Sequence, residues 1–424
     1  MERNDRSILG FVMVGHAMVH IYELSIPILM TIWLLEFSTT AALLGAVVSV
    51  GYGLFGVGAL PGGVLVDRYG PRTLIVACLA GMGLSFLLLS AASGVVGIAV
   101  ALGVWGLSAS VYHPAGLTLI SNGVEKRGRG FAYHGMAGNA GIAGGPLVTA
   151  LLLLLFGWET VAVLLAVPAL AAAVVGLRIR FDPRAAVDGD EATTERGGPD
   201  SLAGFVTDSR ALFTGGFVLV FLIVSLNGLY YRGALTFLPD LLGDFLTAAV
   251  GDVRPGIFDP ESPVAEEFDP ASYLYAGLLT VGIGGQYFGG RLTERIEPDR
   301  GLILMLSALT VIAVGFVPAA GLGLWGLLVA SVVLGFTLFA MQPLTQATIA
   351  KYSMPGSRGL SFGYTYLAIF GIGALGAAVS GIVLTYTSVS AMFAVLAGFA
   401  TIAAALAVVL VTRGNESRSA SGSA

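Results

Sequence analysis

Two ionisable residues lie deep inside long apolar stretches of the sequence, the acid Glu23 and the base Arg232. A charged side chain at the centre of a membrane-spanning helix costs about 2.5–3.5 kcal/mol on insertion scales, so such residues are functional candidates. We interpret Glu23 as the leading proton carrier. Arg232 would hold an anionic part of a substrate or lower the affinity of the carboxylate for protons. The alternative is a static ion pair, although buried pairs are poor stabilisers.

All four histidines of the chain also fall within apolar stretches. His16, His20 and Glu23 follow one another at i, i+4 and i+7, which places them on one stripe of a helix. Histidine titrates near neutral pH, so this stripe is suited to relaying protons. We expect no metal site, because two histidines and one carboxylate lack further ligands nearby. His113 and His134 are candidates for substrate contact or for hydrogen bonds that fix a local turn.

Other polar side chains in the apolar stretches are uncharged, and they suit the lining of a cavity or bridges between helices. Tyr231 stands beside Arg232 and is assigned to the same cavity. Among the amides we favour Asn139 and Gln342 as cavity residues. The full set of amides is Asn139, Asn227, Gln286, Gln342 and Gln346.

The elements that position these residues are predicted to be membrane-spanning helices. Apolar residues make up 56% of the 424 residues and charged residues only 11%, whereas soluble domains carry roughly 25% charged residues. The net charge of −5 argues against nucleic acid as a partner. A span needs about 20 largely apolar residues, and twelve such stretches occur: 8–33, 41–66, 73–93, 96–121, 130–156, 158–178, 211–239, 272–290, 301–319, 322–350, 359–385 and 388–412.

The distribution of Lys and Arg predicts the orientation of these helices. With a cytoplasmic N-terminus, every basic residue except Arg232 and Arg254 falls within a cytoplasmic segment, as the positive-inside rule requires. Both termini are therefore expected in the cytoplasm of a multi-pass plasma-membrane protein. The predicted parts are a six-helix bundle at 1–178, a cytoplasmic linker at 179–210, a six-helix bundle at 211–412 with an outside loop at 244–270, and a cytoplasmic tail at 413–424.

The two halves repeat one another in sequence. A Gly-x-Leu-x-acid-Arg segment follows the second apolar stretch and recurs after the eighth. Duplicated halves are a known route to transporters with a central site at the repeat interface. The first copy continues to a further glycine and arginine, and the named positions are Gly63, Asp67, Arg68, Gly70 and Arg72 in the first copy and Gly290, Glu294 and Arg295 in the second.

The first copy resembles the loop 2–3 signature of the major facilitator superfamily, and the second resembles its degenerate partner in loop 8–9. Three stretches are similar to the fosmidomycin-resistance-type and related efflux permeases: Tyr112–Gly116, Arg127–Asn139, and Tyr230–Gly233 with Phe237–Pro239. Gly141-x-x-x-Gly145-Pro146 resembles part of the antiporter signature. The resemblance implies two six-helix bundles around a midplane cavity, alternating access and a monomeric chain.

In that fold, helices 1 and 7 approach each other beside the cavity, so the resemblance implies that Glu23 and Arg232 face it and interact. The signature residues Asp67, Arg68 and Arg72 are expected to lock the cytoplasmic face when the transporter opens outward. The alternative is that they only set the topology.

No P-loop, nucleophile elbow or zinc motif is present in the sequence, so we expect neither an enzyme nor a cofactor. The energy source is then an ion gradient or the gradient of the substrate. The first functional hypothesis is efflux of a small organic molecule by proton antiport. The second is uptake of an organic anion by proton symport, and a third is a non-transporting membrane sensor. The sequence leaves open the substrate, the direction of transport and sodium in place of the proton.

Overall fold

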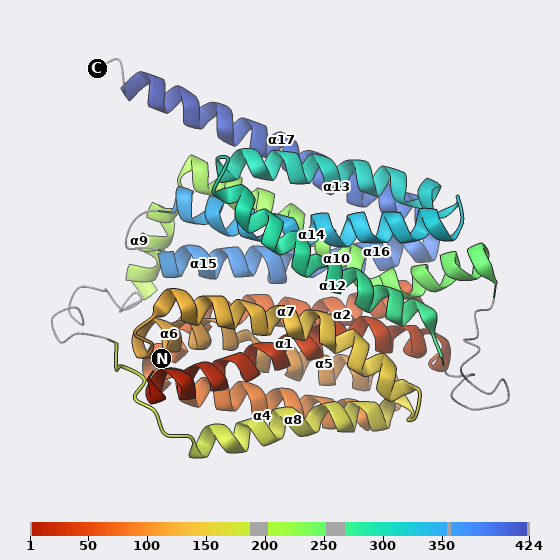
Figure 1. The fold of residues 1–424 in the computed structure, drawn as a ribbon, viewed down its shortest axis with the longest axis horizontal. Helices are drawn as coiled ribbons and strands as arrows, with labels where there is room; N and C mark the ends of the chain where they lie inside the picture. The colour runs from red at the N-terminus through yellow and green to blue at the C-terminus, as the bar shows by residue number, and fades with distance from the viewer. Residues whose placement is uncertain (1, 187–201, 252–267, 354–357, 422–424) are drawn as a thin grey trace.

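The computed structural model describes residues 2–186, 202–251, 268–353 and 358–421. Within these ranges all regular structure is helical, and the long helices lie side by side (Figure 1). The helices are α1 (Arg3–Glu36), α2 (Ala41–Val57), α3 (Ala59–Tyr69), α4 (Pro71–Ser90), α5 (Val95–Ser110), α6 (Tyr112–Gly123), α7 (Arg127–Leu153), α8 (Trp158–Arg178), α9 (Leu202–Leu212), α10 (Gly215–Val250), α12 (Pro270–Thr293), α13 (Pro298–Ala320), α14 (Leu324–Tyr352), α15 (Arg358–Tyr366), the π-helix η2 (Leu367–Ile372), α16 (Leu375–Tyr386) and α17 (Val389–Ser421).

Eleven helical segments of the described chain are long and apolar enough to cross a membrane, counting α2 with α3, α5 with α6, and α15 through α16 as single spans. The twelfth is α12, whose 24 residues include Gln286 and several glycines that lower its hydropathy. The prediction of an all-α membrane protein is confirmed.

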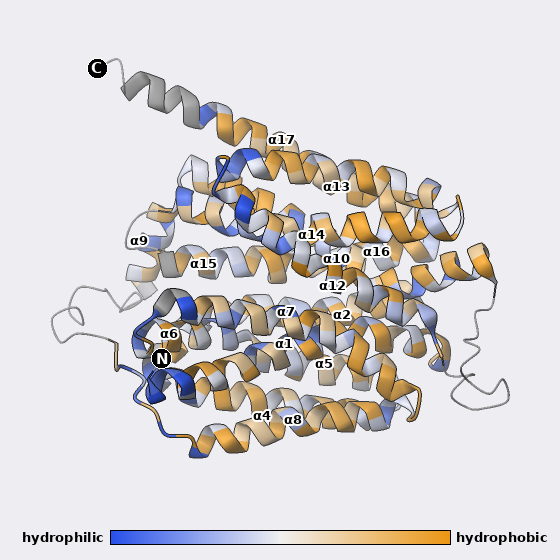
Figure 2. Cartoon of the chain, viewed as in Figure 1, coloured by the Kyte–Doolittle hydropathy of each residue, from blue (hydrophilic) through white to orange (hydrophobic). Residues whose placement is uncertain are grey.

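The helices run between two ends of the molecule. We call the end where α1 begins and α17 ends the termini face, and the end where α1 and α10 finish the loop face (Figure 1). Hydrophilic residues gather at the termini face, while the middle of the bundle is largely apolar (Figure 2). This banding is what a helix bundle needs in order to sit in a hydrocarbon layer.

The buried side chains form two clusters that correspond largely to the two halves of the chain. One is built mainly on α1 to α8 and the other mainly on α10 to α17. The division is not complete, because Leu24 and Ile28 of α1 belong to the second cluster and Phe237 of α10 belongs to the first. Helices α1 and α10 therefore tie the halves together.

Two stretches that the sequence predicted as continuous helices are interrupted. The stretch 41–66 breaks at Gly58, between α2 and α3. The stretch 96–121 breaks at Val111, between α5 and α6. Each break lies three residues before a proline, Pro61 or Pro114. Because proline has no N–H and its ring clashes with the carbonyl four residues earlier, the helix cannot continue unchanged through that turn.

The stretch predicted at 359–385 also contains an irregularity, the π-helix η2 between α15 and α16. Single π turns inside α-helices are frequently found at functional sites. Here η2 packs against both α2 and α10, so the irregular turn lies where the two halves meet.

The structure differs from the predicted boundaries around the hydrophilic segments. Helix α10 continues beyond the predicted end at residue 239 because Asp240 and Asp244 are exposed at the loop face and need no apolar surroundings. It ends at Gly251, whose φ of +74° favours glycine. Part of the predicted linker forms α9, and α17 extends into the predicted tail. The remaining linker and loop residues, 187–201 and 252–267, lie outside the described ranges.

Candidate functional site

The two deep charges predicted from the sequence lie in contact. Arg232 of α10 donates a hydrogen bond from Nη2 to Oε1 of Glu23 on α1. Glu23 is 1% exposed and Arg232 is 2% exposed, so the pair is almost wholly screened from solvent. The pair joins the N-terminal half to the C-terminal half at the contact of α1 with α10.

Aromatic rings surround the Arg232 guanidinium. Its central carbon lies 3.8 Å from the ring centre of Tyr52 and 5.5 Å from the centres of Tyr231 and Phe370. Cation–π contacts of this kind stabilise a desolvated cation by about 2 kcal/mol. Tyr52 also donates its hydroxyl to the main-chain carbonyl of Glu23 at 3.0 Å. Tyr52 and Phe370 were not predicted from the sequence, because aromatic residues in apolar helices give no signal that separates a site from the core.

The histidines of the sequence prediction gather beside this ion pair. His20 Nδ1 lies 2.5 Å from Oε2 of Glu23, and its Nε2 lies 3.1 Å from Nε2 of His16. The ring of His134 stacks on that of His16 with centres 3.8 Å apart, and the ring of His113 lies 5.3 Å from it at a right angle. All four histidines are buried.

The contacts of the two α1 histidines show where this network has room for protons, and the role of each ring nitrogen depends on its tautomer. His16 Nδ1 lies 2.7 Å from the carbonyl oxygen of His134, which can only accept, so this nitrogen carries a hydrogen. In neutral His16, Nε2 is then an acceptor, and the proton between the two Nε2 atoms belongs to His20. The contact of His20 with Glu23 needs a second proton. An ionised Glu23 and a neutral His20 bring only one proton to these two contacts, so both can be hydrogen bonds only when the network carries one proton more.

Three of the histidines are also spaced as metal ligands could be. His16, His20 and His113 each offer one ring nitrogen, and these atoms lie within 4.8 Å of one another. His113 on α6 supplies a third ring nitrogen, a ligand that the stripe of His16, His20 and Glu23 on α1 does not contain. Nitrogens at this spacing can share protons or bind a transition-metal ion. Assays of the site therefore need a chelator as a control against metal binding.

A chain of three amides crosses between the halves. Asn139 of α7 donates from Nδ2 to Oε1 of Gln286 on α12. Gln286 donates in turn from Nε2 to Oε1 of Gln342 on α14 at 2.9 Å. The structure thus brings together both amides that the sequence analysis favoured, through a third that it had noted.

The first copy of the repeated motif lies at the termini face, around the turn from α3 to α4. Gly70 closes α3 with a φ of +79°, a conformation that favours glycine. Arg72 donates to the main-chain carbonyls of Gly176 and Leu177, at 2.9 and 2.7 Å, at the end of α8. Arg72 thereby binds the negative end of a helix dipole within its own half.

The other motif residues make fewer contacts. The guanidinium of Arg68 lies 5.3 Å from the ring of Tyr69. A methyl group at Gly63 would meet nothing within 4 Å. The side chain of Asp67 lies outside the described part of the structure.

In the second copy, Glu294 and Arg295 are exposed at the end of α12. A neighbouring network that the sequence analysis missed joins α13 to α14. Lys351 lies 2.6 Å from Glu297 and 2.9 Å from Asp299, and Tyr352 donates to Asp299 at 2.8 Å. The sequence feature that could have indicated this network is Lys351, a lysine directly after the predicted span 322–350.

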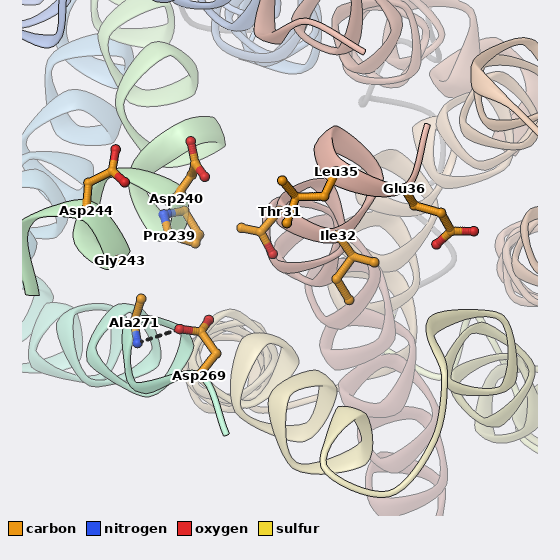
Figure 3. Close-up of a pocket in the computed structure, with 10 residues that line it drawn as sticks. All are labelled: Thr31, Ile32, Leu35, Glu36, Pro239, Asp240, Gly243, Asp244, Asp269 and Ala271. Atoms are coloured by element: carbon orange, nitrogen blue, oxygen red, sulfur yellow. Dashed lines mark hydrogen bonds between the residues drawn. The ribbon is translucent and has the colours of Figure 1, made fainter. Parts of the chain in front are cut away.

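A pocket of about 660 Å³ lies at the loop face between the halves. Thr31, Ile32 and Leu35 of α1 face the helix ends that carry Asp240 and Asp244 across this space (Figure 3). The pocket was not predicted, because its lining comes from helix ends distant in sequence.

Comparison with known proteins places this fold in a family. A family model described as Major Facilitator Superfamily matches residues 12–322 and 260–424. A stretch of 132 residues is 31% identical to the probable L-galactonate transporter of Escherichia coli (strain K12), covering 29% of this chain and 28% of that protein. The match therefore spans less than a third of the length of that relative.

Solved structures resemble the whole chain. A bacterial homolog of the human lysosomal transporter Spinster, in an inward-facing and occupied conformation, superposes with a TM-score of 0.72 and 15% identity over 97% of this chain and 98% of that one. The nucleoside transporter NupG superposes with a TM-score of 0.73 and 13% identity over 97% and 99%. At these identities the likeness concerns the fold alone.

The chain belongs to the Major Facilitator Superfamily. It is a multi-pass membrane protein of a family of transmembrane transporters. The predicted superfamily membership is confirmed.

Proposed function

We propose that this chain is a proton-coupled secondary transporter that moves a small organic molecule by alternating access. The observation that carries the proposal is the pair of contacts that His20 makes, with Glu23 Oε2 at 2.5 Å and with His16 Nε2 at 3.1 Å. Both contacts can be hydrogen bonds only when the network carries one proton more than a carboxylate and a neutral imidazole supply. The network also touches Arg232, the cation that links the halves, so gain or loss of the proton acts directly on the interface that must open.

In the proposed cycle, Glu23 and Arg232 hold the halves together until a proton or a substrate competes for one of them. A proton on Glu23 cancels its charge, and a bound anionic group on Arg232 replaces it. Either event weakens the pair and lets the two bundles rock around the central site. His16 and His20 would pass the proton to Glu23.

We further propose the arrangement that the sequence predicts around this site. The termini face is cytoplasmic, the loop face lies outside, and the transporter works as a monomer in the plasma membrane. The residues from Gly63 to Arg72 would close the cytoplasmic face, with Arg72 holding α4 against α8. The proposed direction is efflux by proton antiport.

The part-antiporter motif supports that direction. Added methyl groups at Gly141 and Gly145 of α7 would overlap the main chain of α1 at Ala17 and Ile21. The two helices are thus packed at backbone contact beside the proposed proton site.

A second candidate is proton-coupled uptake of an organic anion. Arg232 is the specific observation in its favour, because a buried guanidinium is suited to a carboxylate. The similarity to a probable L-galactonate transporter points the same way, over the part of that protein that matches.

The test is proton flux in liposomes that contain the purified protein and a trapped pH-sensitive dye. Small organic anions and cations are screened with a chelator present, so that metal binding at the histidines cannot contribute. We expect one class of compound to move protons, and Glu23→Gln to abolish the response. Glu159→Gln, which alters an exposed acid on α8, should leave it intact. Substrate flux without proton movement in the wild-type protein would refute the coupling.

A further inference from the structure

Arg232 has an edge that Glu23 does not fill. The carboxylate meets the guanidinium through Oε1 and Nη2, while its second oxygen is taken by His20. The Nε of Arg232 is buried and has no hydrogen-bond partner among the described residues. A guanidinium offers its N–H groups as a planar fork that matches a carboxylate with two parallel bonds. The buried Nε–H is therefore a free donor that a second carboxylate can satisfy.

The amide chain of Asn139, Gln286 and Gln342 offers a different chemistry. Each amide has two N–H donors and one oxygen that accepts up to two bonds. The chain itself uses one donor of Asn139, one donor and the oxygen of Gln286, and the oxygen of Gln342. The three side chains are only partly buried. A row of donors and acceptors of this kind fits hydroxyl groups, which both donate and accept.

The two features are connected by a series of contacts between α10, α12 and α14. The ring of Tyr231, the neighbour of the arginine, lies 6.2 Å from the ring of Phe339. Gln342 follows Phe339 by three residues on α14. On α12, Gly282 lies against the ring of Phe339, and Gln286 follows one turn later. Arg232 and the amides are therefore connected through the rings of Tyr231 and Phe339 and one further helical turn.

We infer that the substrate is a polyhydroxylated monocarboxylate, with its carboxylate on the Nε edge of Arg232 and its hydroxyl groups on the amides of Asn139, Gln286 and Gln342. This inference rests on the proposed function only in taking the central site as the substrate site. It does not depend on the direction of transport or on the coupling ion. A carboxylate on Arg232 would also compete with Glu23 for the same cation.

The test separates the two halves of the ligand by measuring binding to the purified protein in detergent. The probes are aldonates of four to six carbons, such as D-gluconate, with D-sorbitol for the hydroxyl groups alone and hexanoate for the carboxylate alone. We expect at least one aldonate to raise the unfolding temperature. We also expect it to bind at least about tenfold more tightly than sorbitol or hexanoate, as loss of one good polar contact predicts.

Variants test which residues bind the hydroxyl groups and which bind the carboxylate. Gln342→Ala should weaken aldonate binding about tenfold, the effect of a lost hydrogen-bonding group, and should leave the weak binding of hexanoate unchanged. Gln346→Ala, an exposed glutamine one turn further along α14, is the matched control and should have no effect. Glu23→Gln combined with Arg232→Gln removes the cation without leaving an unpaired charge, and should abolish the preference of the aldonate over sorbitol.

Three results would overturn the inference: no binding by any aldonate, equal binding by sorbitol, or equal binding by hexanoate with no effect of Gln342→Ala. These results are separate from failure of the proposed function. A protein that binds aldonates but moves no protons with them would refute the coupling alone. Proton-coupled transport of a cation or an apolar compound, with no aldonate binding, would refute the substrate class alone.

Discussion

At the scale of single residues, Glu23 and Arg232 depend on each other because both are buried. Replacing one member leaves the other charge uncompensated, which costs about 3–5 kcal/mol. We predict that Glu23→Gln lowers the free energy of unfolding by this amount, and that Glu23→Gln with Arg232→Gln recovers most of it. Thermal unfolding in detergent measures both. Only the charged pair should support gradient-driven transport, so a fully active double variant would show that the pair is structural.

Tyr52 is predicted to hold Arg232 in place through its ring. The guanidinium lies 3.8 Å from the ring centre, so Tyr52→Leu should cost about 2 kcal/mol of stability through the lost cation–π contact. It should also raise the substrate KM by misplacing Arg232. Tyr52→Phe keeps the ring and should stay close to wild type in KM. Equal losses in both variants would instead assign the effect to the hydroxyl bond with Glu23.

Site residues could be identified from the sequence where burying the side chain costs free energy. A charge inside an apolar stretch has few explanations, so the apolar surroundings of Glu23 and Arg232 are enough to single them out. Tyr52 and Phe370 have no such signal, since their rings are equally at home in a core. The contacts of His16 and His20 depend on which atom faces which within α1 and between α1 and α7, and residue spacing does not determine that.

At the scale of elements, glycines set how closely helices approach. On α7, a methyl group at Gly145 would overlap the main chain of α1 at Ile21, while one at Gly144 would meet nothing within 4 Å. We predict that Gly145→Ala lowers the free energy of unfolding by about 1–3 kcal/mol through overpacking. Gly144→Ala should be neutral or stabilising by up to about 1 kcal/mol, since alanine is the better helix former.

Thermal unfolding of these two variants side by side makes the comparison. Equal effects would mean that α7 does not pack on α1 as described. The part-antiporter motif would then lose its packing explanation.

The positions of the spans followed from apolar stretches of sufficient length, but their interior shape did not. Pro61 and Pro114 were visible in the sequence, yet prolines also lie at Pro239 and Pro343 inside helices that continue. A proline leaves one main-chain carbonyl without its hydrogen bond. Whether the helix ends there depends on whether neighbouring helices supply another donor for that carbonyl. The π-helix η2 was likewise not predictable, because no local sequence feature indicates a π turn.

At the scale of the whole molecule, the proposed orientation predicts which face a reagent reaches. The single cysteine, Cys78, is buried, so the wild-type chain should react little with a membrane-impermeant maleimide. Asp244→Cys, in the pocket at the loop face, should be labelled on intact cells. Arg180→Cys, exposed after α8 at the termini face, should be labelled only after permeabilisation. The reverse pattern would place the termini outside.

The twelve-span fold was predictable because the bilayer restricts a chain to a few solutions, and the repeated motif indicated two related halves. The contacts between those halves were not predictable from residue spacing. The pair of Glu23 with Arg232 and the bond of Asn139 with Gln286 each join segments far apart in the sequence. Which helices meet across the interface came from a family resemblance rather than from residue spacing.

The most direct test of the central claim compares two modes of transport of the substrate that the dye screen identifies. Exchange of labelled for unlabelled substrate needs no net proton movement, whereas accumulation driven by a pH gradient does. We predict that Glu23→Gln and His20→Gln retain exchange and lose accumulation, and His20→Gln does so without leaving Arg232 unpaired. Accumulation at the wild-type level in both variants, with exchange intact, would contradict the claim that this network carries the coupling proton.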